Sequence, residues 1–535
     1  MFVKICNAET SEIQSCLKEL TGNTEIKIIK FSGSFKPNKI YVEKNLNDYY
    51  LYFYKIDRGD LVLDFSAAQV EVVIDDVSID QDLRIFDIVR GLQNIEFRNL
   101  KLSVKIGKSF LHNGKFISIL FNFARCVKMT NADIRLITES PVNLYGIFNN
   151  GNLDTHLETY ADNFVFSNGN LQLNLAYEKP AEKYSSIVYG IYNNYGNAIC
   201  VENSYIFAQN RGYGIANKAI GIYNCGRFAR FANLNVKANN YYGPGNSSEE
   251  GFSYAIINKG LFMLLSNSNI VAEQGGYCAG ITNDGDNAVI SGNKILATHC
   301  ISGKCIILNG NKTVVNGNMI CSTSRNPRQI EIRSSDNLIE NNVIQPLMDS
   351  SNIFSGNSVL IEGNRDYWAS GNIVKGNRII NAKESGILLN YCKNITIKDN
   401  IISCFEENKP KVILEKTENI TIDIENEIEI GKYILTDGTT EIEIRDTSEV
   451  YNGLIRIKEN QKIKADIKLV PLVAETKTER KVKLSLGSFS TSAQFSNNAS
   501  EHNYSKASET IRETDIACLS DNSKWQKAIE EINKI

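Results

Sequence analysis

Apolar and polar residues follow a repeating order through the central part of the chain. In each copy a polar bend ends in asparagine and is followed by a short apolar strand, as in Asn293-Lys294-Ile295, Asn318-Met319-Ile320, Asn342-Val343-Ile344, Asn377-Arg378-Ile379 and Asn400-Ile401-Ile402. Ile295, Ile320 and Ile344 follow one another at 25 and 24 residues, and Ile402 follows Ile379 at 23. A period in the twenties indicates a solenoid, in which each coil of chain packs on the next.

Each copy contains two further apolar segments. One precedes the asparagine bend, and the other reads Gly-Ile-x-Asn or a close variant, as in Gly146 to Asn149, Gly190 to Asn193 and Gly221 to Asn224. Weaker copies of the strand after the bend occur at Ile134, Leu171, Ile206, Val236 and Ile270. This order predicts three strands per coil. Asparagine tolerates the left-handed backbone of a tight bend, and stacked asparagines can form a hydrogen-bonded ladder.

These patterns predict an all-β protein, a parallel β-helix of about a dozen coils running from about Leu83 to Ile430. A β-sandwich with unrelated asparagine-rich turns is the alternative, but its strands would not keep one order of apolar segment and bend through so many copies. Residues 1–80 precede the repeat, residues 81–435 contain it, and residues 436–535 lack its asparagine bends.

The Asn-x-Ile repeat resembles that of the pectin-lyase-like superfamily, whose members are right-handed parallel β-helices. The N-terminal part is also similar, because Ser11 to Leu20 reads as an amphipathic helix with Ile13, Leu17 and Leu20 on one face. Strands are expected after it, at residues 26–31, 39–42 and 61–65. The resemblance implies that the helix covers the open end of the stack, where bare strand edges would otherwise cause aggregation.

The C-terminal region is predicted to be a small β-rich cap or an oligomerisation element. Alternating strands are expected at residues 463–470 and 481–486, and a Ser/Asn-rich stretch at 488–508 leads to a helix near 523–532. A homotrimer held by this region is one expectation.

Composition narrows the classes of function. Lys+Arg 58 nearly balances Asp+Glu 61, so the chain lacks the positive field typical of nucleic-acid binding. No membrane span or export signal is visible, which favours a cytoplasmic or virion-associated protein. The twelve cysteines and four histidines are dispersed without metal-ligand spacing, and most cysteines are expected to be buried and reduced. No cofactor is predicted, and calcium is left open.

Candidate catalytic residues lie on the Gly-Ile-x-Asn strand and in the bend after it. In Ile330-Glu331-Ile332-Arg333 we expect Glu331 and Arg333 to point outward, with Glu362 next to them one coil on. Two carboxylates about 5 Å apart would suit a retaining glycosidase, and their proximity would raise one pKa. In a lyase Arg333 would be the base instead. Asp284 and Asp286 form a second acidic group, and paired surface charges without catalysis are the alternative.

Tyrosines suggest a binding surface for a sugar polymer. Tyr189, Tyr192, Tyr223 and Tyr254 lie on or next to the Gly-Ile-x-Asn strand, beside connections that carry Glu249 and Glu250. Aromatic faces pack against sugar C–H groups, while carboxylates bind hydroxyls. Tyrosines that only cover loops are the alternative.

Several functions remain open. The chain has no Gly-His-Gly as in polygalacturonases, no Asp-Pro-His-Asp as in alginate epimerases, and its one Arg-Ile-Lys, at Arg456 to Lys458, lies beyond the coils. The resemblance implies a polysaccharide lyase or glycoside hydrolase, including a phage tail-spike depolymerase. A non-catalytic binding or structural protein, such as a receptor-binding tail protein, an adhesin or a glycan-assembly scaffold, is the alternative.

Overall fold

A computed structural model of the protein describes residues 2–485 with internal gaps. The gaps are residues 10–11, 21–24, 38, 46–47, 76–78, 109–114, 152–160, 178–184, 213–216, 242–250, 325, 347–355, 406–410, 426–430, 436–439, 445–453, 460–461 and 473–480. The helix expected near residue 523 lies outside the described residues. The chain forms two compact units, the first ending at Cys278 and the second beginning at Ala279. Each unit is described by itself.

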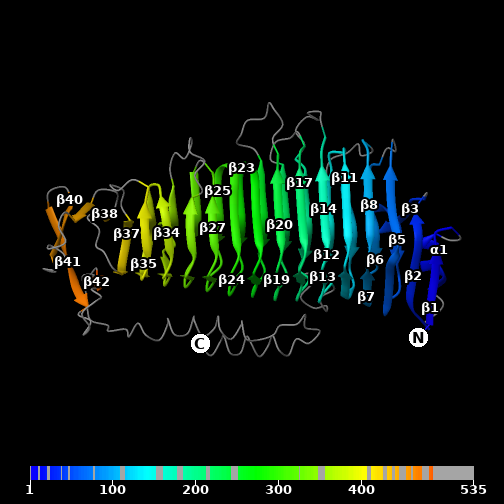
Figure 1. The fold of residues 1–535 in the computed structure, drawn as a ribbon, viewed down its shortest axis with the longest axis horizontal. Helices are drawn as coiled ribbons and strands as arrows, with labels where there is room; N and C mark the ends of the chain where they lie inside the picture. Colours follow the sequence, from blue (N-terminus) through cyan, green and yellow to red (C-terminus); the bar gives the residue numbers. More distant parts are fainter. Residues whose placement is uncertain are drawn as a thin grey trace. The chain divides into compact units, whose positions relative to one another are not determined.

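The first unit is a stack of coils whose strands pair in parallel with the next coil (Figure 1). The first strands of successive coils are β4 (Asp48–Ile56), β6 (Asp82–Ile88), β9 (Phe116–Asn122), β12 (Asn143–Asn150), β15 (Ile187–Asn194), β18 (Lys218–Asn224) and β21 (Phe252–Asn258). The Gly-Ile-x-Asn pattern or a close variant is present from β12 onward. The second strand is one of β7 (Gln93–Arg98), β10 (Arg125–Thr130), β13 (Val165–Ser167), β16 (Cys200–Glu202), β19 (Arg230–Ala232) and β22 (Leu264–Ser266). The third is one of β8 (Lys101–Ile106), β11 (Asp133–Thr138), β14 (Asn170–Leu175), β17 (Tyr205–Asn210), β20 (Asn235–Asn240) and the start of β23 (Asn269–Asn283).

The second unit repeats this arrangement. Its strands are β24 (Val289–Ser291), β25 (Lys294–Leu308), β26 (Val314–Asn316), β27 (Met319–Ser322), β28 (Asn326–Ile332), β29 (Leu338–Glu340), β30 (Val343–Pro346), β31 (Asn357–Glu362), β32 (Ala369–Ser370), β33 (Ile373–Lys375), β34 (Arg378–Ala382), β35 (Ser385–Lys398), β36 (Ile401–Cys404) and β37 (Val412–Glu425). The right-handed parallel β-helix predicted from the repeat is therefore confirmed, as is its division into three strands per coil.

Parallel stacking begins earlier than the sequence predicted. β1 (Phe2–Asn7) pairs with β2 (Ile26–Phe35), and β2 pairs with β5 (Leu61–Ile74). β5 then pairs with β7 through its first residues and with β8 through its last. It thus fuses the second and third strands of a coil without an asparagine bend, which is why the repeat is not visible there. β3 (Tyr41–Asn45) forms an antiparallel hairpin with β4.

The expected N-terminal helix is present as α1 (Ile13–Leu20), with Ile13, Cys16 and Leu17 buried. A disulfide joins Cys16 to Cys6 of β1, and Cys200 is also disulfide-bonded, so the expectation of reduced cysteines is wrong for these three. It holds for the eight other cysteines of the described residues. The predicted C-terminal strands are also present. β38 (Gly431–Leu435), β39 (Thr440–Ile444), β40 (Leu454–Glu459), β41 (Lys462–Leu472) and β42 (Lys481–Ser485) pair mainly in antiparallel order.

Buried asparagines form two hydrogen-bonded ladders. In the second unit the side-chain amides link Asn293, Asn318, Asn342, Asn377 and Asn400 at 2.9–3.0 Å. In the first unit they link Asn122, Asn149, Asn193, Asn224 and Asn258 at 2.6–2.7 Å. The predicted ladder is thus confirmed, but the left-handed residue of the bend is the one before the ladder asparagine, for example Gly317 (φ +65°) and Asn341 (φ +55°).

Candidate functional site

An aromatic ladder runs along the outer face of the first strands in the first unit. It consists of Phe121, Phe148, Tyr192 and Tyr223, which are register partners on β9, β12, β15 and β18. Successive ring centroids are 4.7, 5.0 and 5.0 Å apart, and the ring planes differ by 11°, 27° and 9°. Each inner ring therefore has a neighbouring ring on both faces. The sequence analysis expected free faces for sugar packing, whereas the ladder presents ring edges and phenol hydroxyls.

A second aromatic column lies beside the ladder. Tyr145 and Tyr189 stack at 4.9 Å, and each also makes an edge contact with Tyr192. Tyr254 does not continue this stack, because Ile220 occupies the position between Tyr189 and Tyr254 in the register. The predicted residues Tyr189, Tyr192 and Tyr223 therefore lie together, and Tyr254 lies apart from them.

The phenols of these columns stay protonated over the physiological range. Burial raises the pKa of Tyr189 to about 12 and raises the pKa values of Tyr192 and Tyr223 as well. A protonated phenol is both a donor and an acceptor of hydrogen bonds. The columns can therefore offer hydrogen bonds to a neutral polar ligand without carrying charge.

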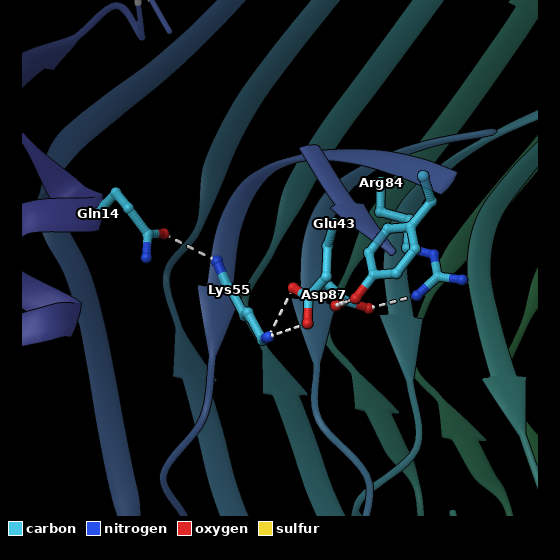
Figure 2. Close-up of polar contacts among 6 residues, drawn as sticks. Gln14, Glu43, Lys55, Arg84 and Asp87 are labelled. Carbon is cyan, nitrogen blue, oxygen red and sulfur yellow. Dashed lines mark hydrogen bonds and ion pairs between the residues drawn. The ribbon is translucent and has the colours of Figure 1, made fainter. Parts of the chain in front are cut away.

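Figure 2 shows a polar cluster that was not predicted from the sequence. It lies next to Phe121, the first ring of the ladder. Asp87 is the register neighbour of Phe121, and Arg84 lies 3.7 Å from the centre of the Phe121 ring. Arg84 donates to Asp87 at 2.9 Å, and the Tyr50 hydroxyl donates to the other Asp87 oxygen at 3.1 Å. Lys55 Nζ lies 2.6 Å from Glu43. A signal was present in the sequence, because Arg84 and Asp87 occupy the outward positions that tyrosine or phenylalanine takes in later coils.

Asp87 and Arg84 are almost completely buried, at 3% and 8% exposure. Burial raises the pKa of Asp87, and the positive charge of Arg84 opposes this only in part. Gln14 of α1 accepts a hydrogen bond from the Lys55 backbone at 2.8 Å, which ties the helix to the same coil. The cluster therefore holds the N-terminal elements against the first coils.

Glu331, the leading catalytic candidate, is the centre of a cationic cluster in the second unit. Its carboxylate lies 2.7 Å from Lys304 Nζ, 3.1 Å from Arg328 Nη1 and 2.5 Å from Arg333 Nη2. Glu331 is fully buried, Lys304 is nearly so, and the two arginine side chains are 41% and 49% exposed. Burial alone would raise the pKa of Glu331, but the three cations together lower it.

The expected carboxylate pair is not formed. Glu331 pairs in register with Leu360, and Ile332 pairs with Ile361, so Glu362 is level with the residue after Ile332. Glu331 is on the outer face of the strand, between the core residues Ile330 and Ile332, but its cationic neighbours shield it from solvent, and its pKa is lowered rather than raised. The prediction of two adjacent carboxylates with one raised pKa is therefore wrong. What the structure brings together is Glu331 with Arg333.

Asp284 and Asp286 lie in the bend after β23 and accept hydrogen bonds from the bend of the following coil. Asp284 accepts from the Asn309 side chain at 2.7 Å, and Asp286 accepts from the Asn311 backbone at 2.7 Å. These contacts hold successive bends together. Glu249 and Glu250 lie outside the described residues.

No group of three or more His, Cys, Asp or Glu side chains suited to a metal ion occurs within the part of the chain that the structure describes. None of the helices described there has the length and apolar character needed to cross a membrane.

No protein-family model matches the chain, and no curated protein matches it. Among solved structures it is similar to the A-module of a mannuronan C-5 epimerase from Azotobacter vinelandii, with 12% identity over 77% of this chain and 98% of that one and a TM-score of 0.38. It is also similar to the tailspike protein of E. coli bacteriophage HK620, with 8% identity over 89% and 90% of the two chains and a TM-score of 0.37. A third is DFA-IIIase from Arthrobacter chlorophenolicus A6, with 10% identity over 71% and 95% and a TM-score of 0.35.

Proposed function

We propose that this β-helix protein binds a linear polysaccharide along the aromatic ladder and the neighbouring column of Tyr145 and Tyr189. The observation that carries the proposal is the repetition of aromatic side chains at one position on successive coils, about 5 Å apart, of which Phe148, Tyr192 and Tyr223 are half-buried and Phe121 is buried. A surface that repeats one group at the spacing of β-strands suits a ligand that also repeats.

The chemistry of the surface favours a sugar. The edge of an aromatic ring is partially positive and attracts oxygen atoms, and each phenol can donate and accept a hydrogen bond. Hydroxyl groups and ring oxygens of a polysaccharide supply the complementary atoms. Nucleic acid is disfavoured by the near balance of 58 basic and 61 acidic residues.

Glycan-array binding followed by isothermal titration calorimetry with the best glycan tests the proposal. Tyr192→Phe and Tyr223→Phe keep the stacked rings and remove only the hydroxyls, so melting should change little. Each should weaken binding about three- to tenfold, the range expected for one neutral hydrogen bond. Tyr205→Phe, on β17 and away from both columns, is the matched control. Unchanged affinity in the double variant Tyr192→Phe/Tyr223→Phe would contradict the assignment of the surface.

Cleavage of the bound polysaccharide stays a prediction, and the same glycans can test it. Hydrolysis releases reducing ends alone, whereas lysis also gives an unsaturated product that absorbs in the ultraviolet. Both assays should be run with calcium and with a chelator, so that any dependence on calcium is measured. Glu362→Gln, Asp284→Asn and Asp286→Asn remove the predicted carboxylates that are still available as acid or base.

Sedimentation equilibrium of the full chain tests the expected trimer.

A further inference from the structure

The cationic cluster of Lys304, Arg328 and Arg333 carries more positive charge than Glu331 neutralises. Three cations surround one carboxylate, so these four side chains have a net charge of +2. A buried carboxylate needs a partner, since an unpaired buried charge is strongly destabilising. One cation would meet that need, and Lys304, almost as buried as Glu331, already does so at 2.7 Å. The two arginines therefore add more positive charge than the burial of Glu331 requires.

The arrangement holds the like charges close together. Lys304 and Arg328 are register partners on adjacent coils. Arg328 lies on β28, and Arg333 is the first residue after that strand. Like charges at such spacing repel one another, and the repulsion is stronger near a protein surface than in water. Glu331 offsets this repulsion from beneath the cations, where its side chain is fully shielded from solvent. Glu362 is level with Arg333 on the next coil and offsets part of this positive charge, and the remainder faces outward through the half-exposed guanidinium groups.

We propose that the cationic cluster is a binding site for an oxyanion carried by a polymeric ligand, a carboxylate or a sulfate ester on a polysaccharide, with Glu331 as the buried template that holds the cations in place. Guanidinium groups are suited to this role, because their planar N–H donors match two oxygens of an oxyanion at once. This site is distinct from the aromatic ladder, which carries no charge and lies in the other unit.

Binding of three polymers shows whether the site prefers a carboxylate or a sulfate ester. Isothermal titration calorimetry of the full chain would use polygalacturonate for carboxylate, dextran sulfate for sulfate ester and plain dextran as the uncharged reference, each at two salt concentrations. The test variant is Arg328→Gln/Arg333→Gln, in which Lys304 still pairs with Glu331. The matched control is Arg378→Gln/Lys393→Gln, which removes two exposed positive charges elsewhere in the second unit.

The wild type should bind polygalacturonate or dextran sulfate more tightly than dextran, and binding should weaken as salt rises. The test variant should lose about a hundredfold in affinity, about tenfold for each arginine. The control variant should stay within about twofold of the wild type. The proposal is overturned if neither anionic polymer binds more tightly than dextran, if the test variant binds like the wild type, or if the control variant loses as much.

A second variant covers the case in which the test variant does not fold. Arg328→Lys/Arg333→Lys keeps both charges and removes the forked donors, so its melting temperature should match the wild type. Its affinity for the anionic polymer should fall about tenfold, because a lysine offers one point contact instead of two parallel bonds. Full affinity in this variant would overturn the site. Binding of a neutral glycan along the aromatic ladder should be the same in all of these variants, so the two proposals fail separately.

Discussion

Two buried carboxylates of this chain have pKa values shifted in opposite directions. Burial favours the protonated form of both. At Asp87 burial outweighs the attraction of Arg84, and the pKa is raised. At Glu331 burial is outweighed by Lys304, Arg333 and Arg328 together, and the pKa is lowered. The number of cations within contact, rather than burial alone, decides the direction in which the pKa shifts.

Glu331→Gln should destabilise the fold at neutral pH by about 3 kcal/mol or more, because it leaves three cations without their carboxylate. The folded pKa of Glu331 lies below its unfolded value, so its stabilising effect is present above the unfolded pKa and is lost as pH falls through the folded pKa. Urea unfolding at neutral and at acidic pH measures this effect, and the gap between wild type and variant should narrow in acid. Glu362→Gln, at a half-exposed position, is the control, and an equal loss there would contradict the reasoning.

Ile320 and its neighbour Met319 on β27 give a second matched pair. Ile320 is fully buried and pairs with Ile344 on the next coil, whereas Met319 is 45% exposed. Ile320→Asp should cost several kcal/mol, since it buries an unpaired charge. Met319→Asp should change thermal melting little. Similar melting of the two variants would show that the inward register of β27 is wrong.

Among the elements, α1 and β1 cover the start of the stack. Deleting Met1 to Leu20 removes the strand that pairs with β2 and exposes its edge, so the truncated chain should aggregate. A milder pair is Leu17→Asp at a buried position and Ser15→Asp at an exposed position of the same helix. Light scattering during heating should detect early aggregation for the first substitution only. If the truncated chain stayed monodisperse and equally stable, the proposed role of α1 and β1 in covering the stack would be contradicted.

The Cys6–Cys16 disulfide closes a loop of 10 residues between β1 and α1. Cys6→Ala/Cys16→Ala should lower the free energy of unfolding by about 2–3 kcal/mol, on the scale expected for a loop of this length. Urea unfolding of the wild type and the variant under non-reducing conditions measures this difference. Cys126→Ala, at a cysteine outside any disulfide, is the control.

A strand could be predicted from the sequence where an asparagine bend adjoins it. Strands that follow an asparagine bend, such as β27 and β30, were identified because the bend marks the period. β5 was not, because it has no bend. The wrong prediction of a Glu331–Glu362 pair has a different cause. It aligned Glu331 with Glu362, whereas the true partner of Glu331 is Leu360, two residues earlier. A shift of two leaves every side chain on the same face, so the alternation of apolar residues cannot detect it. It moves two side chains about 7 Å apart along the strand, enough to separate a catalytic pair.

At the scale of the whole molecule, the two units should unfold separately. Each coil of a solenoid contacts only its neighbours, so a local defect need not unfold distant coils. In an Ile320→Asp/Trp525→Phe variant, fluorescence of Trp368 should report early melting of the second unit. Far-ultraviolet circular dichroism should show a further transition at higher temperature from the first unit. A single transition seen by both probes would mean that the chain melts as one cooperative body.

The repetition of the aromatic ladder also affects how a polymer would occupy it. A chain of identical sugars can sit on evenly spaced groups in many equivalent alignments, each displaced by one repeat of the ladder. The number of alignments grows with polymer length, so apparent affinity should keep rising after every ring position is filled, through a statistical factor rather than new contacts. On moving from one alignment to the next, each interior sugar exchanges its contact for an equivalent one on the neighbouring ring, so the net loss of contacts is confined to the two ends. Long polymers should therefore diffuse along the ladder without dissociating, and short oligosaccharides should leave it quickly.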